Sequence, residues 1–122
     1  MSDVTPKWLL RALDERDGHV CAWHGAEARS DVCRPGTLVP QHRDGGMGGS
    51  AVKHRLSNVV WLDSLTNGLI EADPTMQAEA YRRGVKLRGD VVTEEEPIEH
   101  AVHGRCFLLD DGSVVSAGEV GW

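Results

Sequence analysis

The sequence predicts a small, irregular α+β domain with an N-terminal helix, a central unit of two strands and a helix, and a C-terminal β-hairpin. The length of 122 residues fits one domain with a modest core. Segments of helical periodicity alternate with short β-branched runs, which is the pattern of an α+β fold. The 14 glycines mark frequent breaks, so the elements are expected to be short.

The N-terminal segment is expected to form a short helix. Thr5 and Pro6 suit its N-cap and first helical position, and Gly18 suits its end. Four apolar residues are expected to share one face of this helix: Trp8, Leu9, Ala12 and Leu13.

The central unit begins with a strand over residues 37–40, which delivers Gln41 and His42 at its end. A polar loop follows, with four glycines in the five positions 45–49. Residues 58–62 (NVVWL) then form a β-branched apolar run of strand length. Two strands joined by a long loop are therefore predicted.

Two helices follow the second strand. Asp63 or Ser64 is the candidate N-cap of the first, whose apolar residues recur at helical spacing. Asp73 and Pro74 begin the second helix, and Gly84 ends it.

The chain is predicted to comprise a domain over residues 1–88, an exposed acidic linker over 89–99 and a hairpin extension over 100–122. The linker is assigned from its glutamates and proline, and the hairpin from two apolar strands around a turn at 110–112 (DDG). The core of the domain is the strand, strand and helix unit at 38–71.

The formal charge of −6 argues against a protein that coats nucleic acid through a positive field. Its charges are grouped, however. One basic group surrounds the glycine loop and another follows the last predicted helix: Arg43, Lys53, His54 and Arg55, then Arg82, Arg83, Lys86 and Arg88. A basic face is one interpretation, and scattered solvated charge is equally open for the second group.

The three cysteines, Cys21, Cys33 and Cys106, lack the regular spacing of a disulfide scaffold. The N-terminus has no long apolar segment, which argues against a secretory signal and against a membrane span. These features predict a cytoplasmic protein.

The polar residues of the central unit are expected to meet. Gln41 and His42 end the first strand, Asn58 starts the second, and Asn67 lies in the helix that crosses them. An imidazole and amide oxygens could therefore converge on one polar pocket. A surface histidine, a turn asparagine and a helix-surface asparagine are the structural alternatives.

The stretches "VPQHRDGGMGGS", "SNVVWL" and "TNGLIEAD" resemble the HNH nucleases, which share a ββα-metal motif, and in particular small HNH proteins of bacteriophages. The resemblance covers residues 38–71 and implies a DNA endonuclease in the cytoplasm of a bacterial host. It makes His42 the general base, since a neutral imidazole can accept a proton from water near neutral pH. It implies that Asn58 holds the loop and that Asn67 binds one divalent cation, Mg²⁺ or Mn²⁺.

The glycine loop can be interpreted as a DNA contact. Its backbone N–H groups would approach phosphates, and Arg43, Lys53 and Arg55 would add positive charge. A loop that only faces solvent is the alternative.

The chain departs from the HNH pattern at Gln41, where the family has an acidic or imidazole metal ligand. Gln41 and Asn67 offer only neutral oxygens, so weak metal binding is expected. Asp63 or Glu71 could lend a carboxylate, although Asp63 is better suited to capping the helix. The alternative function is a catalytically degenerate HNH-like regulator that binds DNA or a host or phage protein.

A structural zinc ion is not expected. Cys21 and His24 have a ligand-like spacing, but zinc-binding HNH proteins complete the site with a Cys-x-x-Cys pair. In this chain Asp63 and Thr66 occupy the corresponding places, so too few ligands remain.

Overall fold

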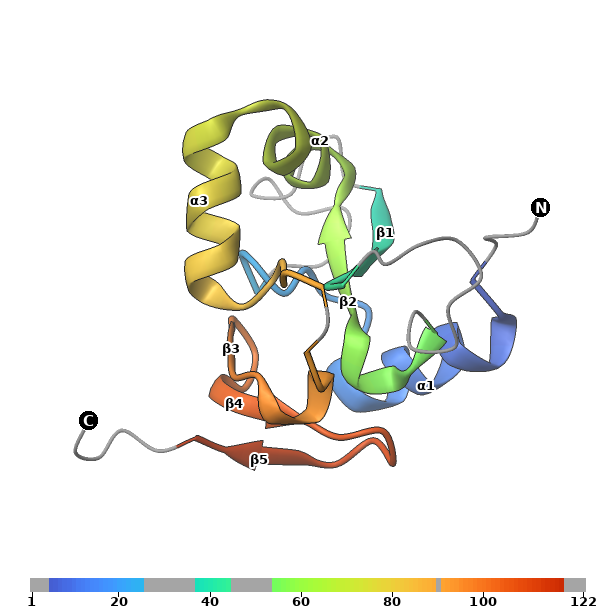
Figure 1. The fold of residues 1–122 in the computed structure, drawn as a ribbon. Helices are drawn as coiled ribbons and strands as arrows, with labels where there is room; N and C mark the ends of the chain where they lie inside the picture. The colour runs from blue at the N-terminus through green and yellow to red at the C-terminus, as the bar shows by residue number, and fades with distance from the viewer. Residues whose placement is uncertain (1–4, 26–36, 45–53, 90, 118–122) are drawn as a thin grey trace.

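The computed structural model describes residues 5–25, 37–44, 54–89 and 91–117 and confirms the predicted α+β class. An N-terminal helix, a two-stranded hairpin, two helices and a C-terminal antiparallel sheet follow one another along the chain (Figure 1). The glycine loop at 45–49, Lys53 and Cys33 lie outside the described residues, as do the last five residues of the predicted extension.

Helix α1 (Lys7–Asp17) packs through Leu9 and Leu13, which are completely buried. Trp8 does not share this buried face as expected, because the residue is 56% exposed. Consecutive helical residues point about 100° apart, so Trp8 turns outward when Leu9 faces the core. Pro6 occupies the N-cap position without a side-chain cap, and Thr5 therefore does not cap the helix.

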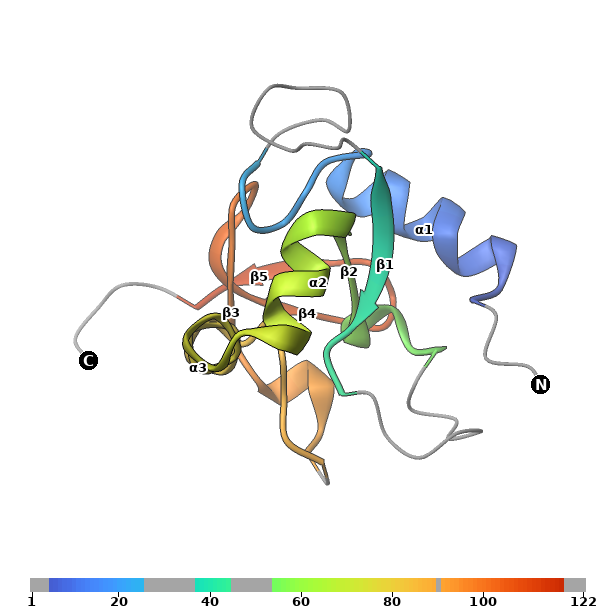
Figure 2. The same ribbon diagram turned by 90° about the horizontal axis from the view of Figure 1, so that it is seen from above.

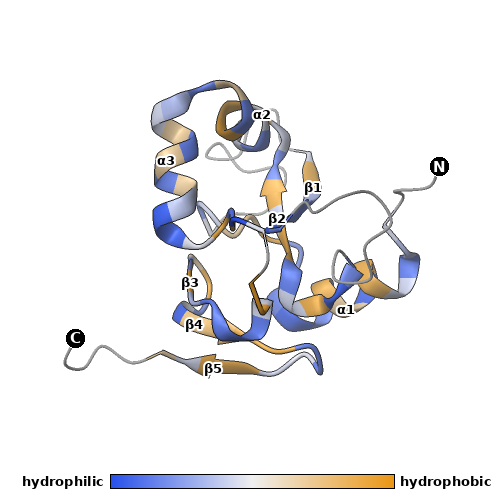
Figure 3. Ribbon diagram, viewed as in Figure 1, coloured by the Kyte–Doolittle hydropathy of each residue, from blue (hydrophilic) through white to orange (hydrophobic). Residues whose placement is uncertain are grey.

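Strands β1 (Leu38–His42) and β2 (Val59–Asp63) form an antiparallel hairpin in which Leu38 pairs with Asp63 and His42 with Val59. The first strand thus runs two residues beyond its predicted end. Every residue of β2 is buried. Its apolar residues lie at the centre of the molecule, between α1, α2 and the C-terminal sheet (Figure 3).

Helix α2 (Ser64–Ala72) follows β2 directly and lies over the hairpin, as the view from above shows (Figure 2). Its predicted cap is confirmed, since Asp63 accepts a hydrogen bond of 2.6 Å from the N–H of Thr66. Helix α3 (Pro74–Arg83) has the predicted Asp73 cap. It ends at Gly84, whose φ of 77° lies in the left-handed region that favours glycine.

The C-terminal sheet contains β3 (Ile98–His100), β4 (Gly104–Leu108) and β5 (Val114–Ser116) in that spatial order. The predicted hairpin is β4–β5, and β3 adds a third strand.

The segment predicted as an exposed linker is packed against the rest of the molecule. The short 3₁₀ helix η3 (Thr93–Glu95) buries Thr93, and Ile98 is 1% exposed. Ile98 and Leu108 belong to the same hydrophobic cluster as Leu9. A single core therefore joins the ββα unit to the C-terminal sheet.

Candidate functional site

His42 and Asn58 occupy the same end of the β1–β2 hairpin. His42 ends β1, and Asn58 ends the 3₁₀ helix η2 (Leu56–Asn58) just before β2. The Asn58 side chain is completely buried and binds the backbone of Asp44 twice, accepting from its N–H at 2.8 Å and donating to its carbonyl at 3.0 Å. The amide thus fixes the chain two residues after the imidazole, which is the loop-holding geometry expected for Asn58.

His54 adds a second imidazole beside His42. Their rings meet edge to face, with centroids 5.5 Å apart. In the sequence His54 is recognisable only as part of a basic group, because nothing local indicates that the chain returns to His42 after twelve residues.

Asn67 lies on α2 with its Oδ1 atom buried and without a hydrogen-bond partner among the described residues. Leaving a buried acceptor unpaired costs about 1–3 kcal/mol, so such an atom calls for a donor, a water molecule or a cation. This oxygen fits the metal-ligand role expected for Asn67.

Gln41 is 7% exposed and donates its Nε2 hydrogen to the carbonyl of His42 at 3.2 Å. It therefore contacts the backbone of the candidate base. Its oxygen is neutral, so it provides no charge to hold a hard cation such as Mg²⁺.

The two carboxylates considered as substitute ligands, those of Asp63 and Glu71, have other partners in the structure. Both oxygens of Asp63 accept hydrogen bonds from Thr66, one from the N–H and one, at 2.9 Å, from the hydroxyl. Glu71 is 55% exposed and pairs with Lys86 at the surface. Asp63 therefore caps α2, and its Oδ2 atom also faces Cys21 and His24.

Arg43 is a buried structural residue and not a surface contact for DNA. Its side chain is completely inaccessible, and its guanidinium donates to three carbonyl oxygens at 2.7–2.8 Å, those of Gly84, Ser57 and Glu96. Two longer bonds of 3.4 Å reach Thr93 and Pro97. Burial lowers the pKa of Arg43 to about 10, which still leaves the group charged at neutral pH. The expectation of a phosphate contact is corrected accordingly.

Arg55 remains at the surface, where its side chain is 48% exposed and pairs with Asp110 at 3.2 Å. It is the one residue of the expected DNA-contacting set, Arg43, Lys53 and Arg55, that lies at the surface of the described chain.

The second basic group is largely neutralised by neighbouring glutamates. Glu79 accepts hydrogen bonds from Arg82 and Arg83, which lower the pKa of its carboxyl to about 2. Lys86 pairs with Glu71. These contacts favour the interpretation of this group as solvated, balanced charge.

Two groups of metal-ligating side chains come together within the described part of the chain. The first contains Cys21, His24 and Asp63. The Cys21 Sγ atom lies 3.6 Å from Nδ1 of His24 and 4.0 Å from Oδ2 of Asp63, and the latter two atoms are 3.2 Å apart. Cys21 and His24 are a ligand-like pair in the sequence, whereas Asp63 was considered as a ligand beside Asn67 and as a helix cap, not as a third ligand to this pair.

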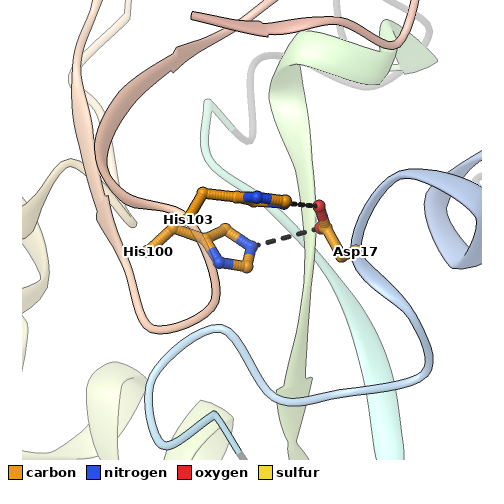
Figure 4. A group of neighbouring side chains, drawn as sticks. All are labelled: Asp17, His100 and His103. Atoms are coloured by element: carbon orange, nitrogen blue, oxygen red, sulfur yellow. Dashed lines mark hydrogen bonds and ion pairs between the residues drawn. The ribbon is translucent and has the colours of Figure 1, made fainter. Parts of the chain in front are cut away.

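The second group contains Asp17, His100 and His103 (Figure 4). Nε2 of His100 lies 3.2 Å from one carboxylate oxygen of Asp17, and Nε2 of His103 lies 2.8 Å from the other. Arg16 donates to the same two oxygens at 2.7 and 2.6 Å. Each oxygen of the buried carboxylate therefore has two hydrogen-bond partners.

This second group is better suited to hydrogen bonding than to metal binding. Nδ1 of His100 accepts from the N–H of Val102 at 3.1 Å, so its ring proton is on Nε2 and faces Asp17. A metal would need a lone pair at that atom, and it would have to displace Arg16. The group instead links the end of α1 to β3 and the following turn. Asp17 lies 83 residues before His100 and 86 residues before His103, so no local sequence pattern indicates this group.

Burial and hydrogen bonding act in opposite directions within this group. Burial disfavours the charged form of Asp17, but hydrogen bonds from Arg16 and His100 outweigh it and hold the pKa of that carboxyl well below its usual range. Burial lowers the pKa of His100, and its bond to Asp17 only partly opposes this. Asp17 is therefore charged and His100 is neutral, although both side chains are buried.

None of the described helices has the length and apolar character that a membrane span requires. Comparison of the chain with protein-family models, with curated proteins and with solved structures gives no match.

Proposed function

We propose that the ββα unit is an HNH-type endonuclease site that hydrolyses DNA phosphodiester bonds, with His42 as general base. The observation that carries the proposal is the pair of hydrogen bonds by which Asn58 holds the backbone of Asp44. A base works efficiently only if its backbone is fixed, and here a completely buried side chain holds the chain two residues after it.

In the proposed reaction, His42 removes a proton from a water molecule whose oxygen attacks phosphorus, and the bond to the 3′ oxygen breaks. A divalent cation held by Asn67, with Gln41 as the other neutral oxygen, would stabilise negative charge on the phosphate and the departing oxygen. His54 flanks the base and limits the orientations that its ring can adopt.

A second candidate is a catalytically degenerate HNH-like regulator that binds DNA or another protein. Gln41 favours it, because the amide is buried and donates to the His42 carbonyl where the HNH pattern has a charged or imidazole ligand.

A plasmid-nicking assay with Mg²⁺, Mn²⁺, Ni²⁺ and Zn²⁺ separates the two candidates. If the protein is an enzyme, the native chain nicks DNA with at least one metal and His42→Ala stops it. His19→Ala is the matched control, because His19 is a half-exposed histidine at the end of α1.

If the native protein does not cleave DNA but the Gln41→Asp variant does, the site is catalytically degenerate. DNA binding is measured in parallel by fluorescence anisotropy at several salt concentrations. A folded protein that neither cuts nor binds DNA, and in which Gln41→Asp creates no cleavage, would rule out both DNA-directed functions.

A further inference from the structure

We propose that Cys21, His24 and Asp63 bind one transition-metal ion of the zinc class. Zinc bonds to nitrogen, oxygen and sulfur of about 2.0–2.3 Å place tetrahedral ligand atoms about 3.3–3.6 Å apart. The three separations here are 3.2, 3.6 and 4.0 Å. The ligand atoms therefore already stand close to coordination distances, and only the separation of Cys21 from Asp63 has to shorten.

The backbone that carries the ligands is fixed independently of any ion. The turn after Cys21 closes through a bond from the N–H of Gly25 to the Cys21 carbonyl, at 2.7 Å. Ala22 then joins two sheets, since its N–H donates to Trp61 in β2 and its carbonyl accepts from Ala101 after β3. Such a preorganised framework lowers the entropic cost of assembling the ligands.

Asp63 has the outer-shell support that metal-binding carboxylates usually show. Thr66 donates to both of its oxygens, at 2.6 and 2.9 Å, and orients the carboxylate toward Cys21 and His24. An ion at this position would tie the start of α2 to the turn after Cys21.

The site is open on one side. Cys21 and Asp63 are buried, but the His24 side chain is 29% exposed, so the group can be reached from solvent through the imidazole. A thiolate and an imidazole select zinc or cobalt over magnesium and calcium. On binding, the Cys21 thiol releases its proton and the His24 ring proton resides on Nε2, so affinity falls with falling pH.

The proposal is tested by titrating the purified full-length protein with Co²⁺. We expect a thiolate-to-cobalt charge-transfer band that saturates at one equivalent and disappears when Zn²⁺ is added. Cys21→Ser should abolish the band. Asp63→Asn preserves a good N-cap but removes the charge, and we expect it to weaken Co²⁺ binding by roughly 10-fold or more.

Thr66→Val tests the supporting hydrogen bond and should weaken binding by roughly 10-fold. Two controls should leave the band unchanged: Cys106→Ala, which removes a buried thiol elsewhere, and His103→Ala, which removes a member of the Asp17 group. Far-UV circular dichroism establishes that each variant is folded.

A native protein without the band would overturn the proposal, and so would a band that survives Cys21→Ser or is lost in His103→Ala. Because the readout is the spectrum of Co²⁺ with the protein alone, the outcome is independent of the cleavage assay and of the proposed function.

Discussion

Replacing Arg43 by methionine should destabilise the protein by about 3–5 kcal/mol, because the buried carbonyl oxygens that its guanidinium binds would lose their donor. Three carbonyl oxygens, those of Gly84, Ser57 and Glu96, would lose their short bonds to the guanidinium. Each buried acceptor without a donor costs about 1–3 kcal/mol, and the avoided desolvation of the guanidinium returns part of this sum.

Urea unfolding followed by tryptophan fluorescence measures the effect, with the slope of the transition used to verify two-state behaviour. Arg43→Lys keeps the charge but cannot reach all three carbonyls, so we expect about half of the loss. Arg11→Met is the matched control, since Arg11 lies exposed on α1 and its loss should change stability by less than about 0.5 kcal/mol. If the free energy of unfolding of Arg43→Met lies within about 1 kcal/mol of the native value, the Arg43 side chain does not have the structural role described above.

Three further outcomes can be measured in the same way. The free energy of unfolding should fall as the pH drops below about 6.5, because the unfolded chain then binds a proton that buried His100, with its lowered pKa, does not accept. Below about pH 4 the unfolded chain also binds a proton at Asp17, whose pKa is lowered in the folded protein, and stability falls further. His100→Gln should reduce the slope of stability against pH between about pH 7 and 5. Gly84→Ala should cost about 3 kcal/mol or more, since φ is 77° and an added Cβ would lie 2.1 Å from the Pro97 carbonyl oxygen; a thermal shift of less than a few degrees would contradict this. Asn58→Ala should cost about 2–4 kcal/mol and speed hydrogen exchange in the backbone that it holds, whereas unchanged exchange would argue against the loop-holding role.

The elements of the fold follow from local chemistry and were predictable for that reason. Asp63, Asp73 and Gly84 act on backbone groups within a few residues, so their cap positions can be identified from the sequence. Trp8 was misplaced because the helical pattern alone does not state which side of an apolar stripe meets the core.

The tertiary roles of charged residues were not predictable. Arg43 follows a candidate base and precedes a glycine loop, which favoured a surface contact, yet its acceptors lie 14–54 residues further along the chain. The packing of 93–99 escaped prediction for the same reason, because its carbonyls, and not its acidic side chains, bind Arg43.

The candidate sites were partly predictable. Asn58 can be selected from its place at the start of the second strand, but its two bonds to the backbone of Asp44 cannot be identified from the sequence. For Asp63, one carboxylate both caps α2 and faces Cys21 and His24, and the sequence indicates only the first of these contacts.

The hydrogen bonds from Arg43 to residues far along the chain also affect folding during synthesis. The residue next to the candidate base is anchored by carbonyls as distant as Glu96 and Pro97, so a chain still emerging from the ribosome cannot secure it until those residues have left the exit tunnel. Fragments that stop after α3 would carry every residue of the ββα unit and keep the bond from Arg43 to Ser57, but they would lack its bonds to Glu96 and Pro97. Emergence of residues 93–97, just before the C-terminal sheet, is therefore the step that completes the anchoring of Arg43, and a product truncated before it should be more open to proteolysis.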